Sequence, residues 1–294
     1  MIKKIIDIPK SITKKKIFNF VGNQYLILTP LGDIHYDISE SNHFDESFFV
    51  KSIKSLLEKN SYFFGMGDFF DLLAHFDRQA LKHMRDDAKR QLDYQFRDIA
   101  YKFIKLLEPT KGRWLGMVKG NHTWTFADET NIEQLLCSEL GCQYFGTEGL
   151  VRIRLEGNYE VYYDIIAHHG TTAPRTVGGN LNMIEQMVRG FDADAYMMAH
   201  SHSSVMGTFN RVYMMPNGDL VEKQKLLVRT PSWYRTYTNL EPLPNNIPAY
   251  KSDGCFGEVR AFNPSTLGCF YIGIGYEKVN GFYIPKSEIA TIRG

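Results

Sequence analysis

The stretch Tyr25-Leu26-Ile27-Leu28-Thr29-Pro30-Leu31-Gly32-Asp33-Ile34-His35 joins a short apolar run to a carboxylate and an imidazole. The run has the length and the apolar character of a buried strand. Asp33 and His35 follow where that strand should end, and both side chains are good ligands for divalent metals. A turn capped by the Asp33 side chain is the alternative explanation of this one motif.

Four further motifs also place a metal-binding side chain just after an apolar run, which is hard to explain by unrelated turns. Six of the nine histidines fall in the five motifs together. Carboxylate, amide and imidazole side chains together form the ligand set of a two-metal hydrolytic site. The four further motifs are Gly67-Asp68-Phe69-Phe70-Asp71, Gly120-Asn121-His122, His168-His169-Gly170 and Ala199-His200-Ser201-His202.

The motifs alternate with predicted helices, which indicates an α/β architecture with its site at the carboxyl ends of the strands. After His202 the pattern changes to hairpins, which predicts further strands. Helices are expected at residues 45–59, 78–107, 129–140 and 179–191. Strands are expected at residues 25–31, 62–66, 114–118, 151–155, 159–167, 195–199, 205–215, 220–229, 269–276 and 281–284.

The order of the five motifs resembles the pattern of the calcineurin-like metallophosphoesterases, and more loosely the layout of uncharacterised phage and bacterial phosphoesterases. The resemblance covers about residues 25–205 and implies a four-layer αββα sandwich of two stacked mixed sheets flanked by helices. Two positions depart from the family pattern. Thr123 stands where the family has an acidic residue, and Leu72 follows Asp71 where the phosphoprotein phosphatases have an arginine.

The resemblance also implies roles for the motif residues. Asp68 would bridge two divalent metal ions, with manganese the first candidate and iron or zinc the alternatives. Either His168 or His169 can be the ligand of the fourth motif, and the family pattern favours His168. His169 would then either support the ligands from behind or face the substrate. One ion would be completed by Asp33, His35 and His202, and the other by Asn121, His168 and His200.

Other residues are candidates for catalysis and for substrate binding. His122 is the expected proton donor, and Asp71 is expected to fix its tautomer. Arg175 follows a ligand loop and could contact a phosphate, although it could equally be an ordinary loop residue. Trp233 and Tyr234 could stack on a base or could simply pack in the core.

Together these residues predict a metal-dependent phosphoesterase, most specifically a phosphodiesterase acting on a nucleic acid or a nucleotide. The Leu72 departure weakens a protein phosphatase assignment. A phosphomonoesterase is the alternative within the enzymes, and a non-catalytic scaffold of the same fold is the alternative of another class. The sequence leaves the choice between DNA, RNA and small nucleotides open, and the oligomeric state as well.

Composition bears on the partners, the compartment and the number of domains of the protein. The 294-residue chain is 44% apolar and 23% charged, with a net charge of +1, so its overall charge gives no case for a nucleic-acid or membrane partner. No apolar run is long enough to span a membrane, and the four cysteines show no metal spacing, so we expect a cytoplasmic protein. We expect one domain over residues 1–294, with a basic arm at 1–24 and a long loop at 235–254. The basic arm could bind nucleic acid, although a solvated strand is the simpler expectation.

Overall fold

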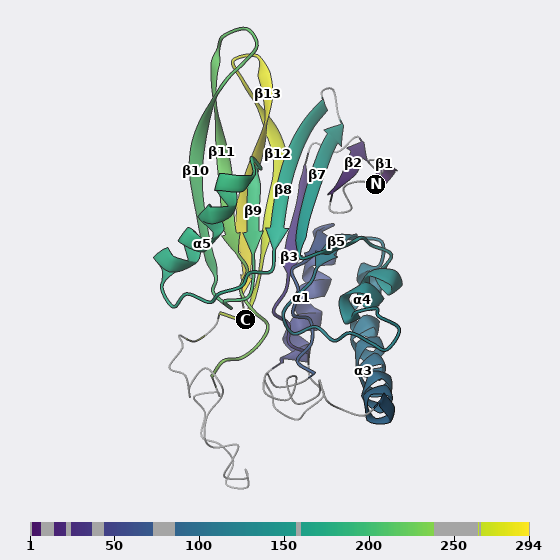
Figure 1. Ribbon diagram of the computed structural model, residues 1–294. Helices are drawn as coiled ribbons and strands as arrows, with labels where there is room; N and C mark the ends of the chain where they lie inside the picture. Colours follow the sequence, from purple (N-terminus) through teal and green to yellow (C-terminus); the bar gives the residue numbers. More distant parts are fainter. Residues whose placement is uncertain are drawn as a thin grey trace.

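Two stacked mixed β-sheets form the centre of the molecule (Figure 1). The structure is a computed structural model, and it describes residues 2–6, 15–21, 25–36, 44–72, 86–156, 160–237, 264 and 266–293. One sheet contains β1 (Ile2–Ile6), β2 (Lys15–Val21), β7 (Glu148–Glu156), β8 (Glu160–His168), β9 (Ala195–Met198), β11 (Leu220–Arg229) and β10 (Val205–Met214), in that order. The other contains β13 (Phe282–Arg293), β12 (Gly268–Val279), β3 (Leu26–Leu31), β4 (Tyr62–Gly65), β5 (Trp114–Val118) and β6 (Tyr144–Gly146).

Helices cover the outer face of each sheet (Figure 1). The six-stranded sheet is covered by α1 (Glu46–Glu58), α3 (Asp86–Leu107) and α4 (Ile132–Leu140), and a short 3-10 turn, η2 (Glu108–Thr110), ends α3. The seven-stranded sheet is covered by α5 (Val177–Gly190). The layers therefore run helix, sheet, sheet, helix, and the predicted αββα sandwich is confirmed.

Three buried apolar clusters hold these layers together. The first lies between the sheets and joins residues such as Leu28 and Ile272 to Ile165 and Met197. The second packs α1, α3 and α4 on the six-stranded sheet, and the third packs Ile184 of α5 on the seven-stranded sheet. Removal of these apolar surfaces from water is the main force that fixes the stacking of the sheets.

The sequence also specifies where the helices begin and end. The Asp45 side chain accepts a hydrogen bond from the Phe48 amide at 2.9 Å, which caps the start of α1. Asn131 and Gln134 form a reciprocal capping box at the start of α4. Gly141 ends that helix in the left-handed conformation, as its position after the apolar pattern predicts.

Parallel pairing brings the ligand-bearing loops to one edge of the sandwich. β3 pairs in parallel with β4, and β4 with β5, so the three loops that follow them lie side by side. In the other sheet β8, β9 and β11 are likewise parallel. All five motifs therefore leave their strands at carboxyl ends, as expected for an α/β fold.

The predicted elements that fall on described residues are present, with shifted bounds. The long helix was expected from residue 78, and the structure describes it from Asp86, because residues 73–85 lie outside the described chain. Part of the expected N-terminal arm forms β1 and β2, which extend the seven-stranded sheet beside β7. The short strand β6 was not predicted. Residues 238–254 of the expected long loop lie outside the described chain. None of the described helices is both long and apolar enough to cross a membrane.

Candidate metal centre

The candidate ligands have an unusual backbone conformation. Asp33, His35, Asp68, His200 and His202 have φ angles of 48°, 50°, 51°, 75° and 53°. Eight non-glycine residues of the described chain have positive φ, and these five are among them. Such angles are costly for side chains larger than glycine and concentrate at functional sites. The ligand pairs two residues apart, Asp33 with His35 and His200 with His202, therefore converge through left-handed turns.

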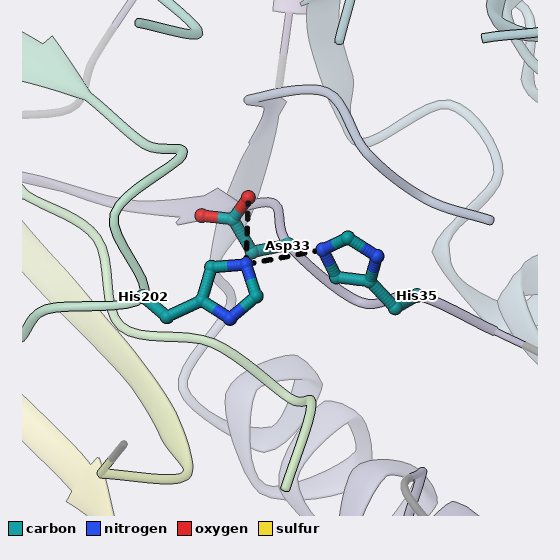
Figure 2. A group of neighbouring side chains, drawn as sticks. All are labelled: Asp33, His35 and His202. Atoms are coloured by element: carbon teal, nitrogen blue, oxygen red, sulfur yellow. Dashed lines mark hydrogen bonds and ion pairs between the residues drawn. The ribbon is translucent and has the colours of Figure 1, made fainter. Parts of the chain in front are cut away.

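The first group of ligands contains Asp33, His35 and His202, which point toward one another in Figure 2. His202 Nε2 lies 3.1 Å from His35 Nε2 and 3.7 Å from Asp33 Oδ1. Burial lowers the pKa of His35 to about 4 and lowers the pKa of His202 well below its usual value. Both rings are therefore neutral near pH 7, which is the form that binds metals.

The second group contains Asp68, His169 and His200, together with Asn121. The Asn121 side-chain oxygen lies 2.9 Å from His169 Nε2 and 2.7 Å from His200 Nδ1. Asp68 Oδ2 lies 3.0 Å from His169 Nε2. Four potential ligand atoms from both sheets therefore meet at one point.

The two carboxylates of the centre have strongly perturbed acidity. Burial raises the pKa of Asp33 to about 7, and its Oδ1 atom has no hydrogen-bond partner within the described part of the chain. Burial also opposes ionisation of Asp68, but the charge of His169 and a hydrogen bond from it hold the pKa of Asp68 well below its usual range. The charge of Asp68 also acts on His35 and His202, so this carboxylate interacts with both groups.

His169, and not the favoured His168, reaches the centre. Its Nδ1 atom lies 2.7 Å from the Met66 carbonyl oxygen and donates to it, which leaves Nε2 facing Asp68. His168 is the last residue of β8, and its Nδ1 accepts a hydrogen bond from the Gly170 amide at 2.7 Å. His169, the first residue after β8, therefore faces the other ligands, whereas the His168 ring is held by the Gly170 amide.

A histidine–aspartate pair lies beside the first group. His122 Nδ1 is 3.0 Å from Asp71 Oδ1, and the His122 ring meets the His35 ring edge-on with centroids 4.7 Å apart. The His122 backbone amide donates to Asp68 Oδ1 at 2.7 Å. The predicted pairing of His122 with Asp71 is therefore present, and it is tied directly to the candidate bridging carboxylate.

Glu133 supports the same loop and was missed in the sequence. Its buried carboxylate accepts a hydrogen bond from Thr123 Oγ1 at 2.6 Å, and burial raises the pKa of Glu133 to about 7. A carboxyl group thus lies next to Thr123, the position where the family pattern has an acid. The signal in the sequence was an acidic residue on the buried face of an amphipathic helix, which is rare without a partner.

The residues predicted to bind substrate lie in different environments. The prediction that Trp233 could stack on a substrate base is wrong, because the side chain is 2% exposed and its ring packs against Phe48 and Phe49. Tyr234 does reach the centre, with its ring centroid 5.2 Å from that of His35 and 5.9 Å from that of His202. Arg175 is exposed on the loop between β8 and α5.

The segment after β11 also belongs to the centre, although no motif in it was recognised. Ser232 Oγ and the Trp233 amide donate to the Asp33 carbonyl oxygen at 2.7 and 3.0 Å, which helps to hold Asp33 in its left-handed conformation. Arg229, the last residue of β11, is fully buried. An apolar strand that ends in Arg-Thr-Pro-Ser is the signal that could have found this segment.

Comparisons with known proteins return solved structures only. No family model matches the chain, and no curated protein sequence matches it. Vacuolar Protein Sorting 29 from Cryptosporidium parvum is 13% identical with a TM-score of 0.39, and the match covers 92% of this chain and 100% of that one. An uncharacterized protein from Streptococcus pneumoniae, described as a predicted phosphoesterase, is 11% identical with a TM-score of 0.34 over 90% and 98% of the chains. GAP50, the anchor in the inner membrane complex of Plasmodium, is 10% identical with a TM-score of 0.39 over 92% and 89%.

These identities and TM-scores are low, so the function is inferred from the geometry of the site. The donor set fits divalent metals on its own chemistry. In each of three groups of three side chains, the ligand atoms lie within 4.8 Å of one another. The imidazoles of His35, His200 and His202 are neutral near pH 7, and a buried carboxylate oxygen of Asp33 has no hydrogen-bond partner among the described residues. A divalent cation would satisfy all three features.

Proposed function

We propose that this protein is a phosphoesterase that depends on two divalent metal ions, and that its substrate is a phosphodiester. The observation that carries the proposal is the meeting of two Asp/His groups at one edge of the sandwich, with the buried Asp68 interacting with both. Asp33, His35 and His202 would hold one ion, and Asn121, His169 and His200 the other. Two bound ions would lower the pKa of water and neutralise the charge of a phosphate.

The residues of the chain supply the remaining steps. The left-handed turns and the buried carboxylates hold the ligands in place before any substrate arrives. His122 lies at the edge of the centre and, when protonated, can donate from Nε2 to the leaving oxygen, while Asp71 orients the ring through Nδ1. Manganese is the first candidate ion, and iron or zinc would accept the same ligands.

A phosphodiester fits the surroundings of the centre better than a phosphomonoester does. A diester carries one negative charge near the reacting phosphorus and needs fewer cationic contacts than a dianionic monoester. Leu72, and not a cation, follows Asp71. Tyr234 offers a half-buried ring beside His35 and His202, where it could contact the group that flanks the phosphate. Arg175 is a candidate for contact with the phosphate itself. A nucleic acid or a nucleotide would provide a group of this kind.

A paired assay tests the proposal. The protein reconstituted with Mn²⁺ is offered bis(4-nitrophenyl) phosphate and 4-nitrophenyl phosphate side by side. We expect faster hydrolysis of the diester, loss of activity on chelation and its return with added Mn²⁺. Asp68→Asn should abolish the activity, whereas Asp98→Asn, at an exposed aspartate paired with Lys102 on α3, should not change it.

The other outcomes identify the alternatives. Preference for the monoester would make the protein a phosphomonoesterase. A protein that binds Mn²⁺ but hydrolyses neither compound nor a panel of nucleic acids and nucleotides would instead be a non-catalytic scaffold of the same fold.

A further inference from the structure

Arg229 is a buried cation that the proposed chemistry does not yet use. The whole residue is 0% exposed. Its Nη2 atom donates to the Thr172 carbonyl oxygen at 2.7 Å, whereas Nε and Nη1 have no hydrogen-bond partner among the described residues. Buried arginines normally use their donors in full, since burial of an unpaired polar group is costly. A fully buried guanidinium with two donor atoms that lack hydrogen-bond partners therefore needs a physical explanation.

The backbone places Arg229 beside the candidate metal centre. It pairs with Met198 in the parallel pairing of β11 with β9. Met198 is two residues before the candidate ligand His200. Thr230, the next residue, donates its amide to the Met198 carbonyl oxygen at 2.8 Å. Three residues beyond Arg229, Ser232 binds the backbone of Asp33. The guanidinium is therefore carried to the same edge of the sandwich as the ligands.

The charge of Arg229 acts on the ligands without a direct bond to them. It interacts electrostatically with Asp33 and with His200. Yet Asp33 Oδ1 has no hydrogen-bond partner within the described chain, only the His202 ring at 3.7 Å, and Asp33 Oδ2 accepts from the His200 amide at 2.8 Å. In a buried setting of low dielectric, such a charge acts over several ångströms with little screening.

We propose that Arg229 is a built-in counter-charge of the centre, which weakens its hold on cations and strengthens its hold on an anionic phosphate. The inference rests on the proposed function and deepens it, because it assigns a residue to phosphate affinity that cannot touch the substrate. Arg229 is a positioning residue in this sense, since its effect passes through the field at the centre. A buried positive charge repels a bound metal ion and attracts a bound anion.

The two effects have opposite signs, and this distinguishes them from damage to the fold. Removing the charge should make Mn²⁺ bind about tenfold more tightly and make inorganic phosphate bind about tenfold more weakly to the Mn²⁺-loaded protein. A purely structural role would weaken both affinities together, because a disordered centre holds neither ligand well.

The experiment measures both affinities by calorimetry in Arg229→Met, Arg229→Gln and Arg229→Lys. Methionine keeps most of the apolar volume, glutamine keeps a donor for the Thr172 carbonyl, and lysine keeps the charge. Arg211→Met, at a half-exposed arginine of β10 that pairs with Asp192, is the matched control. We expect opposite shifts in the methionine and glutamine variants, values close to wild type in the lysine variant, and no change in the control.

Several results would overturn the inference. Affinities that stay unchanged or fall together in the neutral variants would assign Arg229 to structure alone. If Arg229→Met fails to fold, Arg229→Gln decides, and if both neutral variants fail to fold while Arg229→Lys folds with both affinities altered, the counter-charge role is refuted. A wild-type protein that binds no Mn²⁺ would instead remove the proposed function, and this inference with it.

Discussion

His169 shows at the scale of one residue how the centre is prepared for a metal. Burial would lower its pKa, but the neighbouring Asp68 raises the pKa of His169 to about 9. The proton on Nε2 therefore occupies the place that a metal ion would take between Asp68, Asn121 and His200. Metal binding at this position must release that proton.

This proton gives the metal-free protein a specific pH dependence. A histidine whose pKa is higher in the folded state stabilises the fold below its unfolded value of about 6.5, and this stability is lost as the pH rises toward 9. We expect the chelated protein to lose about 2 kcal/mol of unfolding free energy between pH 6.5 and 9, measured by urea denaturation. His169→Asn should lack this loss. An equal loss in the variant would assign the effect to other groups.

His122 is placed to protonate the leaving group. It is the only residue to which we assign proton donation. Its ring is hydrogen-bonded to Asp71, and its backbone amide donates to the Asp68 carboxylate. His122→Ala should slow hydrolysis of an alkyl phosphodiester by about 100-fold or more, because an alkoxide needs a proton to leave. Cleavage of a nitrophenyl ester, whose leaving group needs no proton, should fall much less. Metal content must stay unchanged, and an equal loss on both esters would argue against proton donation.

At the scale of elements, the loops after β4 and β5 meet through two glycines. A Cβ atom on Gly120 would lie 2.1 Å from Asp68 Oδ1 and 2.2 Å from the Asp68 amide nitrogen. A Cβ atom on Gly67, where φ is +89°, would lie 2.6 Å from the backbone of Gly120. Only glycine at these positions lets the loop that carries Asn121 approach the loop that carries Asp68.

Because the two loops lie so close together, adding one methyl group at Gly120 should disturb metal binding. Gly120→Ala must displace Asp68, so we expect a loss of Mn²⁺ affinity of about 100-fold and a lower melting temperature. Gly178→Ala, in the first turn of α5 with no atom within 4 Å of the added carbon, is the control and should be neutral or slightly stabilising. Calorimetric titration and thermal unfolding of both variants decide. Wild-type metal affinity in Gly120→Ala would contradict the geometry.

At the scale of the whole molecule, the centre joins the two sheets. Asp33, His35, Asp68 and Asn121 follow strands of the six-stranded sheet, whereas His169, His200 and His202 follow strands of the seven-stranded sheet. Each proposed ion therefore takes ligands from both sheets. A bound metal would add to the stability that the apolar cluster between the sheets provides.

This cross-linking predicts stabilisation by the metal. Mn²⁺ at 100 times its dissociation constant should stabilise the fold by about 2.7 kcal/mol per independent site, and chelation should reverse this. The increase in melting temperature should be largely lost in Asp33→Asn, where a ligand is removed, and kept in Asp98→Asn on the surface of α3. An increase of the same size in both variants would indicate binding elsewhere on the protein.

The sequence predicts this architecture well because its signals are local. Apolar runs that end in a ligand specify each strand and the edge at which the ligands gather. What the sequence leaves open depends on contacts between distant segments. The choice of His169 depends on the Met66 carbonyl, which lies 103 residues away along the chain. Trp233 and Tyr234 are adjacent aromatic residues that the sequence does not distinguish. Trp233 is buried because its ring packs against Phe48 and Phe49, which lie far away along the chain. Glu133 and Arg229 act from outside the motifs altogether.

The Mn²⁺ content of the reconstituted protein after gel filtration shows whether the chain holds two ions. We predict two ions per chain in the wild type and no more than one in His202→Ala or in His169→Ala, since each variant removes a ligand of a different proposed ion. A wild-type protein with no bound ion, or with the same content in all three proteins, would contradict the assignment of these residues to a two-metal centre.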